Sequence, residues 1–265
     1  MAEYILASGI EAQQRLRLLA RICRPSTLAL LERAGLKEGD RCLDVGCGSG
    51  DVTMDIARCV GPTGRAIGID FDEGIIRLAR EEALEHRVQN VEFRHQRAEN
   101  LHETGYDLVY ARFLLTHLGE PHHTLRAMVN VVRPGGVIVV EDVELSATFC
   151  FPPNAAFECY VRWVCETMRR RGADPDIGPR LPGLFGAAGL AEVAMHLAQV
   201  PLYRMEEKKP FYDITMLQIR HAALAEGVVT PEDFDATYAA FQAFTAAPDS
   251  ICAIPRVWQV WGYKR

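Results

Sequence analysis

The sequence predicts an α/β protein with a doubly wound, mostly parallel sheet. Five short apolar runs alternate with helical segments over residues 41–142, and apolar runs of this length are typical of strands buried on both faces. This alternation favours parallel strands joined by right-handed crossovers. Two later runs, residues 193–203 and 255–263, are expected to add an antiparallel pair at one edge, giving seven strands.

A glycine-rich turn follows the first of these runs. Residues 41–50 read Arg-Cys-Leu-Asp-Val-Gly-Cys-Gly-Ser-Gly, and a helix is expected from Asp51. Glycine reaches positive φ and lets a ligand approach the backbone closely. The N-terminus of a helix also presents unpaired N–H groups. The stretch therefore predicts a turn whose exposed N–H groups receive a polar or anionic ligand.

The second predicted strand ends in an acid at the spacing found in nucleotide-binding units. Asp70 ends the run 66–70, about twenty residues after the turn, where nucleotide-binding βαβ units place a carboxylate on the ribose hydroxyls. Phe71 follows and could stack on adenine or belong to the core. The G-x-G-x-G spacing, with Asp44 just before it, differs from the G-x-G-x-x-G of dinucleotide sites, where an acid would repel the pyrophosphate.

Composition limits the function classes. The chain has 265 residues, about half of them apolar, and a formal charge of −6. The negative charge disfavours nucleic acid as a partner. No apolar run is long enough to span a membrane, and the N-terminus, with Glu3, lacks the basic n-region of a signal peptide, so a cytoplasmic location is expected. The eight cysteines have no metal-ligand spacing, so reduced thiols and no metal are expected.

The segments before the fifth strand carry their own boundary signals. A helix from about residue 9 to 21 and a second from Pro25 to before Gly35 form an N-terminal arm, which either packs on the sheet or closes over a ligand. The helix 52–60 stops at Gly61-Pro62, and 73–86 is the next helix. Strands 90–95 and 105–111 follow. Pro121 opens a helix to residue 132, before strand 137–140.

The pattern loosens beyond Asp142. Residues 149–154 are expected as a turn, 155–171 as a helix, and 184–188 as a short helix that ends at Gly189. Residues 211–225 and 233–245 are further helices, the latter after the Thr230-Pro231 cap signal. We expect one domain over residues 1–265, with a helical arm (1–40), a ligand-binding core (41–144) and a cap that binds a second substrate (145–265).

These motifs together resemble class I S-adenosylmethionine-dependent methyltransferases of the small-molecule branch, similar to ubiquinone/menaquinone-type methyltransferase domains. Residues 44–50 match the first motif of that family, Gly68-Ile-Asp70 the ribose-binding acid, and Ala98-Glu-Asn-Leu101 the end of the adenine motif. Asp107-Leu-Val-Tyr110 and Arg133-Pro-Gly-Gly136 match its later strands. The resemblance implies a Rossmann-like fold with S-adenosylmethionine as cofactor, whose cationic amine and sulfonium explain why an acid is tolerated at Asp44.

The resemblance also implies a set of cofactor contacts. These are Tyr4, Arg15, Asp44, Gly46, Cys47, Gly48, Gly50, Asp70, Phe71, Ala98, Glu99 and Arg112. One position departs from the family: Arg97 stands where an acid usually accepts from the adenine amino group, and a guanidinium has no acceptor. The side-chain part of adenine recognition is therefore in question.

Methyl transfer is an in-line displacement, in which alignment and exclusion of water carry most of the acceleration. A general base is needed only for an acceptor such as a hydroxyl. The candidates are His117, Glu141, Asp142 and His196, although His117 could instead bond to the backbone. Glu141 and Asp142 are adjacent on a strand, so only one of them is expected to face the cleft.

The acceptor is expected to be a small, apolar or aromatic metabolite of secondary or quinone-like metabolism. The residues proposed to bind it are Phe149, Phe157, Tyr160 and Trp163, which could also be core. A homodimer is compatible with the sequence but is not required by it. Two alternatives stay open: a non-catalytic S-adenosylmethionine-binding protein, and an NAD-dependent Rossmann oxidoreductase, against which the loop spacing argues.

Overall fold

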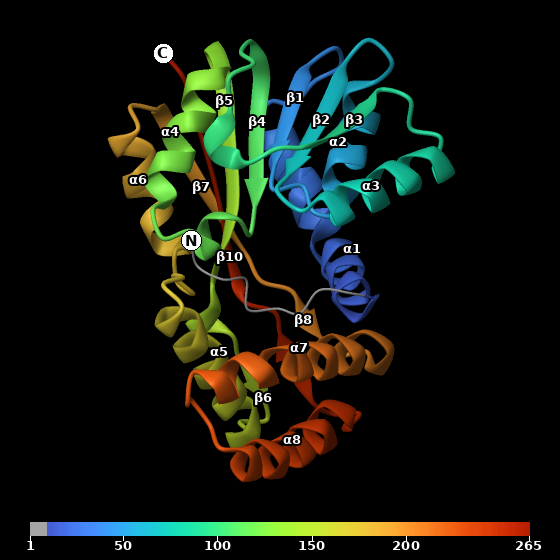
Figure 1. The fold of residues 1–265 in the computed structure, drawn as a ribbon, viewed down its shortest axis with the longest axis vertical. Helices are drawn as coiled ribbons and strands as arrows, with labels where there is room; N and C mark the ends of the chain where they lie inside the picture. The colour runs from blue at the N-terminus through green and yellow to red at the C-terminus, as the bar shows by residue number, and fades with distance from the viewer. Residues whose placement is uncertain (1–9) are drawn as a thin grey trace.

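The central sheet follows the predicted topology. The computed structural model describes residues 10–265, without the side chains of residues 10–14 and 205–208. Within this part the sheet has seven strands in the order β3-β2-β1-β4-β5-β10-β7 (Figure 1). Strands β1 (Arg41–Val45), β2 (Arg65–Asp70), β3 (Val91–His95), β4 (Tyr106–Arg112) and β5 (Val132–Glu144) are parallel, whereas β10 (Arg256–Tyr263) runs antiparallel to β5 and β7 (Ala191–Ala198).

Helices cover both faces of this sheet. On one face lie α2 (Asp51–Val60), α3 (Glu73–Glu85) and the C-terminal half of α1 (Ile10–Arg33). On the other lie α4 (Pro121–Val131) and α6 (Leu181–Ala187), together with the single turn η4 (Gly178–Arg180). Because both faces are buried, the central strands are apolar almost throughout. Strand β5 is longer than the predicted 137–140 at both ends.

A helical cap lies beyond the carboxyl ends of the parallel strands (Figure 1). It is formed by α5 (Ala155–Arg170), α7 (Met205–Ala225), α8 (Pro231–Ala246) and, in the described residues, a three-stranded sheet of β6 (Cys150–Phe151), β9 (Ile251–Ala253) and β8 (Pro201–Leu202). Two predictions were wrong here. The run 193–203 is two strands in different sheets, and the turn 149–154 contains β6. Both errors involve pairing with β9, about fifty or more residues further along the chain.

Pro25 was wrongly taken as a helix start, because it lies inside α1, which is one helix rather than two. The helix predicted from residue 211 begins earlier, and Pro210 lies inside α7. A proline inside a helix removes one N–H donor. In α1 the hydroxyl of Ser26 donates to the carbonyl of Cys23 at 2.9 Å. Packing maintains α1 because its two halves contact different cores: Leu18 and Ile22 the cap, Leu30 and Leu31 the sheet.

A buried polar network fixes α1 to the sheet at this junction. The Glu141 carboxylate on β5 is 1% exposed and accepts hydrogen bonds from Thr27 Oγ1 on α1 at 2.7 Å and from Gln259 Nε2 on β10 at 2.7 Å. The hydroxyl of Tyr110 on β4 donates to it as well. Glu141 therefore joins four elements that are far apart in the sequence.

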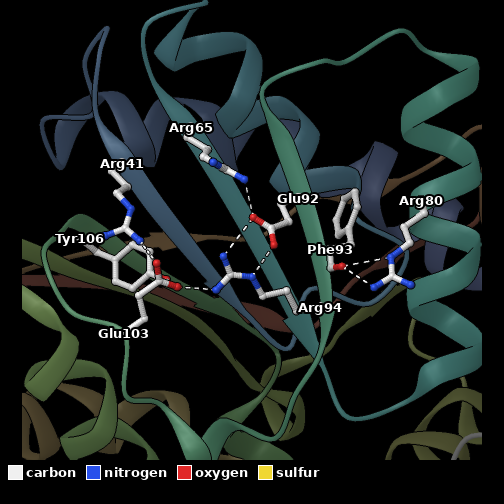
Figure 2. A network of polar contacts seen from close by, with 8 residues as sticks. All are labelled: Arg41, Arg65, Arg80, Glu92, Phe93, Arg94, Glu103 and Tyr106. Carbon is white, nitrogen blue, oxygen red and sulfur yellow. Dashed lines mark hydrogen bonds and ion pairs between the residues drawn. The ribbon is translucent and has the colours of Figure 1, made fainter.

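The edge strand β3 carries a second, more exposed network (Figure 2). Arg94 donates to Glu92 at 2.7 Å and also to Glu103, while Arg65 donates to Glu92 at 2.6 Å. The Arg41 guanidinium lies 4.4 Å from the centre of the Tyr106 ring. Exposed ion pairs add little stability, but charge along an edge strand discourages pairing with another chain. The network also holds Glu103, in the segment between β3 and β4.

We predict that Glu141→Ala lowers the free energy of unfolding by about 3–5 kcal/mol, because three buried donors then lose their acceptor. Urea unfolding measures this change. The control is Glu166→Ala, which removes a half-exposed ion pair with Arg170 and should cost less than about 1 kcal/mol. Equal, small losses in the two variants would contradict the central role of Glu141.

Candidate cofactor and acceptor site

The glycine turn has the expected backbone but a different use of its N–H groups. Gly46, Gly48 and Gly50 all have positive φ, at 74°, 54° and 81°. The N–H groups of Gly46 and Cys47 both donate to the carbonyl of Ile69 at 2.9 Å, and that of Gly48 donates to Asp70 Oδ2 at 3.0 Å. The expectation of exposed N–H groups is thus corrected: at these residues they are consumed by β2 and its terminal acid.

The turn offers open space instead. A Cβ on Gly50 would lie 2.5 Å from Cζ of Phe93, so this glycine is required by the packing of β3. A Cβ on Gly48 would meet nothing within 4 Å among the described atoms. Gly50 therefore shapes the turn from inside the protein, and Gly48 leaves room for a ligand against the backbone.

Asp70 and Phe71 lie together at the end of β2. The Asp70 carboxylate accepts the N–H of Gly48 on Oδ2 and the N–H of Asp72 on Oδ1, both at 3.0 Å. Each oxygen keeps a second lone pair, which could accept a ribose hydroxyl. The Phe71 side chain is 60% exposed, so the core alternative for this residue is excluded and its ring is available for stacking.

The adenine motif lies at the end of the next strand. Ala98 and Glu99 form the single turn η1 (Ala98–Asn100), and Ala98 packs beside Leu101 on the main core. Glu99 and Arg97 are exposed. The ring of His95 bonds through Nε2 to the carbonyl of Phe71 at 2.9 Å, which ties the ends of β2 and β3 together. The departure at Arg97 therefore leaves the backbone and Ala98 as the inner wall of the proposed adenine site.

Asp44 is held beneath the turn, and Arg112 lies near it. Asp44 Oδ2 accepts from Thr53 Oγ1 at 2.6 Å, and burial raises the pKa of Asp44 to about 6, against the opposing effects of Thr53 and Arg112. Arg112 is half-buried and donates to Thr27 Oγ1 at 3.3 Å. Burial favours a lower pKa for Arg112, but nearby groups including Tyr110, Glu141 and Asp44 raise it overall. Arg112 is therefore a permanent cation between two buried acids.

Neither Glu141 nor Asp142 on β5 faces a cleft, contrary to expectation. Glu141 is enclosed in the network described above. Asp142, on the opposite face of the strand, is fully buried and accepts the N–H groups of Thr116 at 3.1 Å and Val143 at 2.9 Å. Burial raises the pKa of Asp142 to about 7 despite these bonds. Its contacts instead support a positioning role, since they hold the single turn η2 (Leu115–His117).

His117 and Arg15 come together at that turn. His117 is half-buried, and burial followed by the charge of Arg15 lowers the pKa of the imidazole to about 4. The ring is therefore neutral at physiological pH. Arg15 is itself buried. It is not among the charges that act on Asp44, which are those of Arg112 and Asp70. Tyr4, the other proposed contact of the arm, lies outside the described residues.

The four proposed acceptor residues divide between core and surface. Phe157, Tyr160 and Trp163 are buried in the cap; the Phe157 ring lies 6.0 Å from that of Phe241, and Trp163 stacks on Phe234 at 5.8 Å. Phe149 is half exposed. A groove of about 1000 Å³ is lined in part by Phe149, Phe157 and Trp163, but the described residues that line it all follow Arg112 and η2, beginning at Ser146. Tyr160 does not line it.

Several site residues escaped sequence reasoning. Thr27 and Gln259 reach Glu141 across 114 and 118 positions of sequence, and no local pattern identifies such partners. Thr53 could have been found, because the strand, turn and helix bring position 53 beneath Asp44. Arg15 was identified, but its neighbours His117 and Tyr160 were assigned to other roles.

We predict that Gly50→Ala chiefly lowers stability, whereas Gly48→Ala chiefly weakens ligand binding. Gly50→Ala should lose about 2–4 kcal/mol of stability, since it combines a disfavoured φ with overpacking against Phe93. Gly48→Ala should lose only about 1–2 kcal/mol but bind S-adenosylhomocysteine at least about 10-fold more weakly, because its methyl occupies ligand space. Urea unfolding and calorimetry measure the two effects. A Gly48→Ala protein with unchanged affinity would contradict this placement.

We also predict that Asp142 makes stability fall with rising pH. Its raised pKa means that the folded state keeps a proton between about pH 4 and 7 that the unfolded chain has released. From pH 5 to pH 8, the wild type should lose about 1–3 kcal/mol more than Asp142→Asn, at about 1.4 kcal/mol per pH unit. Urea unfolding at both pH values tests this, with the exposed Asp235→Asn as control. Equal pH dependence in wild type and Asp142→Asn would refute it.

Comparisons with known proteins agree with this geometry. The chain is 33% identical over 137 residues to the ubiquinone/menaquinone biosynthesis C-methyltransferase UbiE of Pseudomonas fluorescens (strain Pf0-1), covering 49% of this chain and 51% of that protein. It is 32% identical over 111 residues to demethylmenaquinone methyltransferase of Geobacillus sp. (strain WCH70), covering 41% and 47%. The chain thus spans about half the length of the curated relatives that it matches.

Solved structures show the same fold. The YcgJ protein of Bacillus subtilis matches with a TM-score of 0.58 and 20% identity, over 91% of this chain and 99% of that one. A SAM-dependent methyltransferase from Aquifex aeolicus matches with a TM-score of 0.54 and 21% identity, over 73% and 94%. The family model described as a methyltransferase domain matches residues 36–170, which contain the glycine turn, Asp70 and Arg112. The chain therefore belongs to the methyltransferase family, and its fold and cofactor turn are those of the class I, S-adenosylmethionine-dependent type.

Proposed function

We propose that this protein transfers the methyl group of S-adenosylmethionine to a small acceptor with an apolar or aromatic body. The observation that carries the proposal is the bond between the Gly48 N–H and the Asp70 carboxylate. A carboxylate on this N–H removes the donor that a pyrophosphate would need and adds negative charge. The same carboxylate keeps acceptors for the two hydroxyls of a ribose. This arrangement supports a nucleoside without a pyrophosphate over a dinucleotide.

The residues present fit S-adenosylmethionine. Gly48 leaves space against the backbone, Asp70 offers acceptors to the ribose, and the exposed Phe71 ring offers a stacking face. Arg112 uses a single hydrogen bond to a protein group among the described residues, so the rest of its guanidinium can receive the methionyl carboxylate. When bound, the cofactor supplies an electrophilic methyl group on a sulfonium. The turn and Arg112 would fix its direction relative to the acceptor.

The remaining tasks fall to the residues around the carboxyl ends of the strands. Methyl transfer depends chiefly on the orientation of the acceptor and on the exclusion of water. The cap, which lies beyond the carboxyl ends of the strands and has a buried apolar core, supports both. If the acceptor is a hydroxyl, the neutral ring of His117 is the candidate to take its proton, and its pKa of about 4 makes it a weak base for that step. Asp142 would act through the backbone of η2, which it holds in place.

The acceptor class is supported less directly. The printed names of the relatives concern ubiquinone, menaquinone and demethylmenaquinone, and a quinone-like acceptor agrees with the apolar cap. The family match ends at residue 170, however, so α7 and α8 of the cap lie outside it. A small-molecule acceptor is also favoured over nucleic acid by the charge of −6. No helix within residues 10–265 is long and apolar enough to cross a membrane.

Calorimetric titration with S-adenosylmethionine, S-adenosylhomocysteine and NADH tests the proposal. We predict micromolar binding of the first two, none of NADH, and a loss of about 10–100-fold for Asp70→Ala, because charge-assisted hydrogen bonds to the ribose disappear. Asp235→Ala, at an exposed acid on α8, is the control and should bind as the wild type does. Failure of a folded wild type to bind either sulfur compound would refute the proposal.

Turnover separates an enzyme from a non-catalytic S-adenosylmethionine-binding protein. Production of S-adenosylhomocysteine that requires an added quinol or phenol establishes transfer. Binding without production across a broad set of apolar acceptors would favour the non-catalytic alternative.

A further inference from the structure

Arg15 is a buried cation that has no counter-ion among the described side chains. The residue is 7% exposed, and its Nε lies inside the protein without a hydrogen-bond partner. Among the side chains that the structure describes, no Asp or Glu oxygen forms an ion pair with it, whereas Arg17, two positions further along α1, is exposed and pairs with Glu82. Burying an unpaired guanidinium is costly. Such a group points to a ligand that supplies the missing negative charge.

The neighbours of Arg15 place it on the acceptor side of the site. Among the groups whose pKa is clearly shifted, its charge lowers the pKa of His117 on η2 and opposes the rise that burial causes in the pKa of Tyr160 on α5. Both groups are neutral at physiological pH and provide no counter-ion. The Tyr160 hydroxyl makes no hydrogen bond within the described part of the chain. Three polar side chains from α1, η2 and α5 therefore converge at the junction between cap and sheet.

The surroundings of this group are apolar. Leu18 and Tyr160 belong to the cap core, and Leu19, Phe113 and Leu145 pack against it while remaining half-buried. In doubly wound sheets, ligands bind beyond the carboxyl ends of the strands, which is where Phe113 and His117 lie, directly after β4. A flat apolar body can contact these side chains while a charged substituent reaches Arg15.

We propose that Arg15 binds an anionic oxygen group of the acceptor, so that the enzyme selects an apolar or aromatic acceptor that carries a carboxylate or an ionised hydroxyl. This inference rests on the proposed function and narrows its substrate class. Tyr160 donates a second hydrogen bond to the same group. The carboxylate of the cofactor is the other source of such a charge, and Arg112, beside Asp44, is better placed to receive it.

The probes are 2-naphthoate and its neutral, nearly isosteric partner 2-naphthamide, titrated into the wild type with and without S-adenosylhomocysteine. We expect naphthoate to bind at least about 10-fold more tightly than naphthamide, as for a charge-assisted bond in a buried site. Arg15→Met should abolish this preference, change naphthamide affinity by less than about 3-fold and leave S-adenosylhomocysteine affinity within about 3-fold of the wild type. Arg15→Lys should restore part of the preference.

The matched control is Arg17→Met, which removes an exposed cation from the same helix and should keep the wild-type preference. Because Arg15→Met removes an unpaired buried charge, the melting temperature of this variant should equal or exceed that of the wild type. If Arg15→Met does not fold, Arg15→Gln takes its place in the experiment.

Three results would overturn the inference: a wild type that binds naphthoate no better than naphthamide, a variant that loses both probes equally, or a variant that loses S-adenosylhomocysteine more than about 10-fold and so shows that Arg15 serves the cofactor. Failure of the proposed function appears separately, as absence of S-adenosylhomocysteine binding to the wild type.

Discussion

The junction between sheet and cap depends on the buried carboxylate of Glu141. It accepts hydrogen bonds from α1, β4 and β10 at once, and Arg112 lies near it as the balancing cation. A buried acid is stable only if its acceptors are satisfied, so these elements can take few other positions. The C-terminal half of α1 is thereby fixed on the sheet, while its N-terminal half extends to the cap. This position of α1 determines where Arg15 lies.

The cofactor turn shows how a familiar motif can work without free N–H donors. The N–H groups of Gly46, Cys47 and Gly48 are bonded to β2 or its terminal acid. Recognition by this turn would therefore rest on space at Gly48, on the acceptors of Asp70 and on the face of Phe71. Such a site suits a ligand whose charge is positive, because the acids Asp44 and Asp70 lie at the turn. Arg112 and Arg15 provide positive charge on the other side, toward the cap.

The acids of β5 illustrate why catalytic candidates are hard to assign from residue type. Glu141 and Asp142 end an apolar run beside the expected active site, which is typical of general bases. In the structure one of them ties α1 to the sheet and the other holds η2 through backbone N–H groups. His117 lies half-buried between cap and sheet, with a neutral ring. Positioning acids and a neutral histidine agree with a reaction that relies on alignment.

The sequence by itself determined the alternation of parallel strands with helices, the glycine turn, the acid at Asp70 and the antiparallel edge, because these depend on local patterns: buried apolar runs, positive φ at glycine, and helix ends. Tertiary structure decided the rest. The continuation of α1 through Pro25, the division of residues 193–203 between two sheets and the enclosure of Glu141 all arise from contacts with distant segments. Arg15 depends on both: its residue type is visible in the sequence, but only the structure shows that it is buried with no counter-ion among the described side chains.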